Sequence, residues 1–78
     1  MLVMAILEYT EAEFKAIAQV SLRVGNLQRH ILDIKKALVY LHSPEYSNEY
    51  PEHDSKLKRL FINRYTYMFK CLIALQHT

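Results

Sequence analysis

The sequence has few of the residues that interrupt or cross-link a chain. Its 78 residues include one glycine, two prolines, one cysteine and no tryptophan. A lone cysteine, Cys71, excludes an intramolecular disulfide, and the four histidines lack the spacing of a structural zinc site. With 51% hydrophobic residues, the composition predicts a single all-α domain over residues 1–78. Because so short a chain buries a modest core, oligomerisation is the expected source of further stability.

The sequence also lacks a long uncharged apolar run. The opening segment MLVMAILEYTEAE is apolar, but it has no basic region and soon reaches acidic residues, unlike a signal peptide. Nothing approaches the length of a transmembrane helix, so we expect no membrane association and a cytoplasmic protein, in the host cytoplasm if it is viral. Residues 1–9 are expected to form an apolar N-terminal arm.

Charge is distributed unevenly along the chain. All eight acidic residues lie within 1–54, where five basic residues leave a net charge of −3, whereas 55–78 carry five basic residues and no acid. Such asymmetry indicates either an anionic partner or attraction between two segments of one molecule. The sequence leaves both interpretations open.

The first helix is predicted over residues 11–42. TEAE at 10–13 fits a capping box, in which the side chains of Thr10 and Glu13 each accept from the other residue's backbone N–H. From there apolar residues recur every three or four positions, as in a heptad seam: Ile17, Val20, Val24, Leu27, Ile31, Ile34, Leu38 and Leu41. Since the seam keeps its phase across Gly25 and Asn26, the pattern favours one continuous helix.

A loop over 43–53 and a second helix over 54–76 complete a predicted helical hairpin. The loop contains both prolines, and Asp54 or Ser55 is the expected cap. The second helix is apolar around most of its circumference, more than one partner helix can cover. At 1.5 Å per residue the first helix, roughly 48 Å long, would also overhang the second, roughly 34 Å. We therefore expect a homo-oligomeric helical bundle.

Arg64 is a candidate anion-binding residue because it lies inside the apolar arc of the second helix. Burying a guanidinium is costly unless an anion meets it. An acidic residue of the first helix or of another subunit is one expected partner, and a bound phosphate is the other.

Arg23 and His30 lie two turns apart on the predicted first helix, a spacing that resembles the arginine and histidine of dimeric helical ribonucleases. That family has a polar residue after the arginine, where this chain has Val24. A solvated polar face explains the same residues. No catalytic constellation, metal site or cofactor motif is found, and a DNA-reading helix is not expected, so the chain is predicted not to be an enzyme.

The layout of TEAEFKAIAQV, a long helix, a loop and DSKLKRLFINRYTYMFKCLIAL resembles the small phage anti-CBASS proteins. This resemblance implies an oligomer of helical hairpins that sequesters cyclic nucleotide signals of a bacterial defence system without catalysis. Superposing the capping boxes brings the family's base-stacking tyrosine to Ile6 and its phosphate-binding lysine to Ser21. Nearby Tyr9, Lys15 and Arg23 are the expected substitutes.

The function expected from the sequence is therefore that of a phage anti-defence sponge for cyclic oligonucleotides. Its candidate ligand-binding residues are Tyr9, Lys15, Arg23 and Arg64. The first alternative is an inhibitor, immunity or regulatory protein that binds a foreign protein through its apolar surfaces. A helical ribonuclease ranks last.

Overall fold

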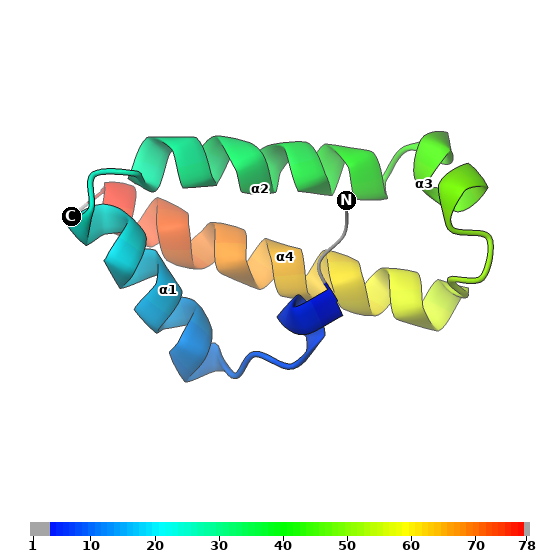
Figure 1. Ribbon diagram of the computed structural model, residues 1–78, viewed down its shortest axis with the longest axis horizontal. Helices are drawn as coiled ribbons and strands as arrows, with labels where there is room; N and C mark the ends of the chain where they lie inside the picture. The colour runs from blue at the N-terminus through cyan, green and yellow to red at the C-terminus, as the bar shows by residue number, and fades with distance from the viewer. Residues whose placement is uncertain (1–3, 78) are drawn as a thin grey trace.

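Helices form most of the chain in the computed structural model, which describes residues 4–77 (Figure 1). The elements are a 3-10 helix η1 (Met4–Leu7) and the α-helices α1 (Glu11–Arg23), α2 (Leu27–Leu41), α3 (Pro44–Glu49) and α4 (Ser55–Gln76). This range contains no strand, which confirms the predicted all-α class. Of the predicted apolar arm, residues 1–3 lie outside the described part. No helix within it is long and apolar enough to cross a membrane.

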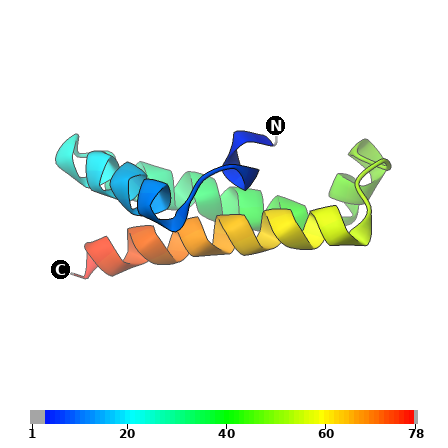
Figure 2. The ribbon, with the colours of Figure 1, turned by 90° about the horizontal axis from the view of Figure 1, so that it is seen from below.

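The helices pack around α4, the longest of them. Helix α2 runs antiparallel to α4, while α1 crosses α4 at an angle (Figure 1). Seen from below, α1 and α2 lie on the same side of α4, and η1 also contacts α4 (Figure 2). The core lies between these layers and is centred on the α4 residues Phe61, Tyr65, Met68 and Leu72.

The predicted continuous helix over 11–42 is wrong, because the chain turns at Gly25. Gly25 has a φ of 74°, the left-handed conformation that glycine adopts without a steric penalty. The N–H of Asn26 donates to the carbonyl of Ser21 at 2.9 Å, and the N–H of Gly25 donates to that of Leu22 at 3.1 Å. This pair of bonds is a Schellman motif, which ends α1 and satisfies its last carbonyls.

The apolar seam predicted one continuous helix incorrectly because α1 and α2 bury different faces. Helix α1 buries Phe14, Ala18 and Ser21, whereas Val20 and Val24 of the predicted seam are exposed. In α2 most seam residues are buried as predicted, for example Ile31 and Ile34, whereas Leu38 is partly buried. The regular spacing across Gly25 therefore joins two faces that do not form one continuous surface.

Folding α1 back beside α4 also removes the predicted overhang. Phe14 is fully buried, and its ring centroid lies 5.5 Å from that of Tyr67 in α4. Helices α1, α2 and η1 of the same chain thus cover much of the wide apolar arc of α4, while Leu60 stays 40% exposed. The arc and the overhang no longer require other copies of the chain to bury them.

The segment 43–53, predicted to be an irregular loop, contains helix α3. Proline at its start has the fixed φ and missing N–H that suit a first helical position. Tyr46 of α3 is buried, and its hydroxyl lies 2.8 Å from Nδ1 of His53. The His53 ring stacks on Phe61 at 5.7 Å and 11°, so aromatic packing closes this end of the molecule.

The predicted helix starts are confirmed. The Thr10 N–H donates to Oε1 of Glu13 at 3.0 Å, and the Glu13 N–H donates to Oγ1 of Thr10 at 3.2 Å. Oδ1 of Asp54 accepts from the N–H of Leu57 at 2.8 Å, so Asp54 rather than Ser55 caps α4. Local side-chain chemistry thus fixes where α1 and α4 begin.

Replacing Gly25 by alanine tests the turn. No atom lies within 4 Å of a Cβ built at Gly25, so the cost comes from the left-handed backbone alone. We expect Gly25→Ala to lower the free energy of unfolding by about 1–2 kcal/mol and Gly25→Asn by less, because asparagine tolerates this conformation. Urea unfolding followed by circular dichroism measures both. Stabilisation by alanine would instead indicate a continuous helix, in whose interior alanine is preferred to glycine by about 1 kcal/mol.

Candidate functional site

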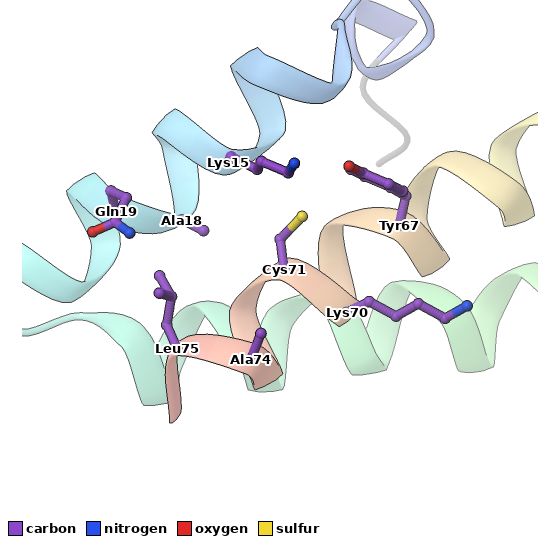
Figure 3. A pocket seen from close by; sticks show the side chains of 8 residues that line it. All are labelled: Lys15, Ala18, Gln19, Tyr67, Lys70, Cys71, Ala74 and Leu75. Atoms are coloured by element: carbon purple, nitrogen blue, oxygen red, sulfur yellow. The ribbon is translucent and has the colours of Figure 1, made fainter. Parts of the chain in front are cut away.

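A groove between α1 and α4 forms a pocket in the described part of the chain (Figure 3). Its volume is about 400 Å³. Residues of α1 and α4 alone line it: Lys15, Ala18, Gln19, Tyr67, Lys70, Cys71, Ala74 and Leu75. The groove exists because the turn at Gly25 brings α1 alongside α4.

Three polar atoms meet at the groove. The ammonium end of Lys15 and the hydroxyl of Tyr67 point toward each other from opposite helices, and the thiol of Cys71 points into the space between them (Figure 3). The ammonium end of Lys70 extends away from this point. A cation, a hydroxyl and a polarizable sulfur therefore face a shared space.

Helical spacing places these side chains and leaves room between them. Lys15 and Gln19 are one turn apart on α1, and Tyr67 and Cys71 are one turn apart on α4, so each pair shares a face. The small side chains of Ala18 and Ala74 line the groove between the helices. The result is an apolar floor with Lys15 and Tyr67 near each other and Gln19 farther along α1 (Figure 3).

The electrostatics around Tyr67 favour a protonated tyrosine beside a lysine. Burial raises the pKa of Tyr67, and the nearby negative charge of Glu11 raises it further. Side-chain hydrogen bonds with Glu11 and Cys71 raise the pKa in the same direction, so the protonated hydroxyl of Tyr67 already has partners that a ligand would have to replace. The ammonium of Lys15 and the apolar side chains suit a ligand with an anionic group and a flat apolar body, whereas the carboxylate of Glu11 beside Tyr67 opposes a second negative charge.

Tyr67 and Cys71 were not singled out as site residues by the sequence. Both lie within the wide apolar arc predicted for the second helix, where nothing in the sequence marks them as ligand-binding residues. The structure leaves Cys71 half-buried on the wall of the groove. Their spacing of four residues signals a shared face, but not the element that this face meets.

Tyr9 and Arg64, two of the predicted ligand-binding residues, are brought together. Nη1 of Arg64 donates to the backbone carbonyl of Tyr9 at 3.2 Å, and the Tyr9 ring packs edge-on against Phe14 at 5.6 Å. The two ion pairs found among residues 4–77 do not include Arg64, so no acid of the first helix is its partner. Arg64 instead ties the N-terminal segment to α4.

The other two predicted residues lie apart. Lys15 is on the groove, whereas Arg23 is the exposed last residue of α1. Within one chain the four candidates therefore form no common pocket.

Arg23 and His30 do not have the spacing along one helix on which their resemblance to ribonuclease residues was based. Arg23 ends α1 and His30 lies in α2, beyond the turn at Gly25, so the two are not spaced along one helix. Nδ1 of His30 lies 2.6 Å from Oγ of the buried Ser21, which links α1 to α2. Within residues 4–77, no group of His, Cys, Asp and Glu side chains is arranged to hold a metal ion.

No protein-family model, curated protein or solved structure matches this chain.

His30 should make the stability of the protein depend on pH. Burial lowers its pKa from 6.5, and the charge of Asp33 opposes this shift only in part. The folded protein thus binds the proton less tightly than the unfolded chain, so the stabilisation is complete above pH 6.5 and is lost as the pH falls through the lowered pKa. We expect the difference in unfolding free energy between wild type and His30→Gln to shrink from neutral pH to about pH 5.

Urea unfolding of both proteins across this pH range measures that difference. Using the difference between them removes the contribution of other titrating groups. A difference that stays constant or grows on acidification would contradict the assignment of the lowered pKa to His30.

Proposed function

We propose that the protein is a non-enzymatic binding protein that sequesters nucleotide-type anions in the groove between α1 and α4. The observation that carries this proposal is the convergence of Lys15 and Tyr67 above the apolar floor (Figure 3). Lys15 and the Tyr67 hydroxyl supply donors to a phosphate, while the floor and the tyrosine ring provide contact area for a base.

The size of the groove supports a nucleotide unit as the ligand. A volume of about 400 Å³ lies at the lower end of the range for small-molecule sites. One groove therefore suits a single nucleotide unit with its phosphate, and a cyclic oligonucleotide would extend beyond it. Cyclic oligonucleotides, the ligand class implied by the resemblance to phage anti-CBASS sponges, thus fit best if two chains each contribute a groove.

A homo-oligomer is part of the proposal for this reason. Exposed apolar side chains support it: Val24 is 68% exposed and Val39 is 66% exposed. Val20 and Leu32 add to the apolar surface of the same two helices, α1 and α2. Contacts between these surfaces would remove them from water and bring grooves of different chains into one assembly.

A foreign protein partner is the alternative favoured by the same exposed side chains. The two possibilities differ in the behaviour of the isolated protein. Sedimentation equilibrium yielding a discrete oligomer supports self-assembly, whereas a monomer at all concentrations favours a surface that awaits another protein.

Neutralising Lys15 should weaken nucleotide binding. We expect Lys15→Gln to reduce the affinity for a cyclic dinucleotide roughly tenfold, since a hydrogen bond to a charged group contributes about 1.5–3 kcal/mol. Tyr67→Phe should cause a smaller loss because it removes only a hydroxyl. Isothermal titration calorimetry measures both. Lys35→Gln, which alters an exposed lysine of α2 outside the groove, is the matched control. Equal losses in Lys15→Gln and Lys35→Gln would contradict a defined site.

The alkylation rate of Cys71 reports independently whether a ligand occupies the groove. Cys71 is the only cysteine in the chain and lines the groove, so a thiol reagent reports on this site alone. We expect a bound nucleotide to slow alkylation of Cys71 several-fold, as followed by mass spectrometry. The free amino acid cysteine, alkylated under the same conditions, controls for quenching of the reagent. An unchanged rate at saturating nucleotide would place the ligand elsewhere.

A further inference from the structure

A second cavity lies on the other side of α1 from the groove, among η1, α1, α2 and α4. Its volume is about 220 Å³. The residues that line it are Ile6, Tyr9, Phe14, Ile17, His30, Ile34, Tyr65 and Met68. None of them lines the groove, although the ring of Phe14 contacts that of Tyr67 in the groove wall at 5.5 Å.

The lining of this cavity is apolar and aromatic apart from one imidazole. It contains no Lys, Arg, Asp or Glu, in contrast to the two lysines of the groove. His30 is held by its Nδ1 contact with Ser21, which leaves Nε2 as the ring nitrogen available to a ligand. Burial lowers the pKa of His30, so the imidazole is neutral at physiological pH. A charged ligand would find no opposite charge here.

The size of the cavity indicates the size of its occupant. An enclosed apolar cavity of about 150 Å³ in another protein binds benzene. The cavity described here is partly open to solvent, so its volume sets the scale of the ligand and not a strict upper limit. At about 220 Å³, it has room for an aromatic ring with a fused ring or a short substituent. The rings of Phe14 and Tyr65 on its walls can pack against such a molecule edge-to-face or offset.

We infer that this cavity binds one small neutral aromatic molecule with a single polar group, of the indole or phenol class. The aromatic body lies among Phe14, Ile17 and Tyr65, and its N–H or O–H group hydrogen-bonds to the imidazole of His30. This site is independent of the proposed nucleotide groove and takes a ligand of different chemistry.

Binding at this cavity would also hold the N-terminal segment in place. Ile6 and Tyr9 on its wall belong to that segment, and the Tyr9 carbonyl already accepts a hydrogen bond from Arg64. A ligand that contacts these residues and the helices together binds only the folded state. It should therefore raise the midpoint of thermal unfolding as its concentration increases.

Indole is a suitable probe because the chain has no tryptophan. At excitation wavelengths longer than those that tyrosine absorbs, only indole fluoresces. Its emission shifts to the blue in an apolar site. We expect saturable binding of one indole per chain. Ile17→Phe, which fills the cavity, should weaken binding at least tenfold, and His30→Leu should weaken it roughly fivefold through loss of one hydrogen bond.

Ala74→Phe is the matched control because it fills the groove and leaves the cavity unchanged. We expect it to keep indole binding while losing nucleotide binding, so failure of one site is distinguishable from failure of the other. The inference would be overturned if indole showed no saturable binding or bound wild type and Ile17→Phe equally. Loss of indole binding in Ala74→Phe, or a stoichiometry of one indole per two chains, would overturn it as well.

The wild-type protein provides a readout that does not depend on variants folding. Met68 lies on the cavity wall, and its methyl group can be observed by NMR after isotope labelling. Bound indole should shift this resonance and give intermolecular nuclear Overhauser effects to it. Saturable indole binding with no change at Met68 would place the ligand elsewhere and overturn the inference.

Discussion

The left-handed turn at Gly25 is the constraint on which the rest of the structure depends. It reverses the chain between α1 and α2 and places both helices on the same side of α4 (Figure 2). Without this reversal Phe14 would lie on an overhang, and the apolar surface of α4 would lack one of its three covering elements. One residue without a Cβ therefore determines how a chain of 78 residues closes its own core.

The same turn makes α1 a wall of two pockets. Lys15 and Ala18 face the groove against α4, whereas Phe14 and Ile17 face the cavity shared with η1 and α2. The two sites differ in charge, since the groove has lysines and the cavity has a single imidazole. The proposed anion site and the proposed neutral site thus lie on two faces of one helix.

Much of the fold follows from local signals, whereas the sites depend on long-range packing. The caps at Thr10 and Asp54 could be predicted because their partners lie three residues away in sequence. The break at Gly25 could not, because apolar residues on both sides keep a three-four spacing although they belong to different buried faces. Tyr67 and Cys71 were placed in an apolar arc, and only the return of α1 turns that part of the arc into the wall of a groove.

The most direct test of the central claim is an NMR measurement of contacts between α1 and α4. The turn at Gly25 predicts strong nuclear Overhauser effects between the rings of Phe14 and Tyr67, whose centroids are 5.5 Å apart. In a mixture of labelled and unlabelled protein, these effects should arise within single chains and not between different chains. Sequential helical contacts running unbroken through Gly25, with no signal between Phe14 and Tyr67, would show one long helix and contradict both the fold and the groove.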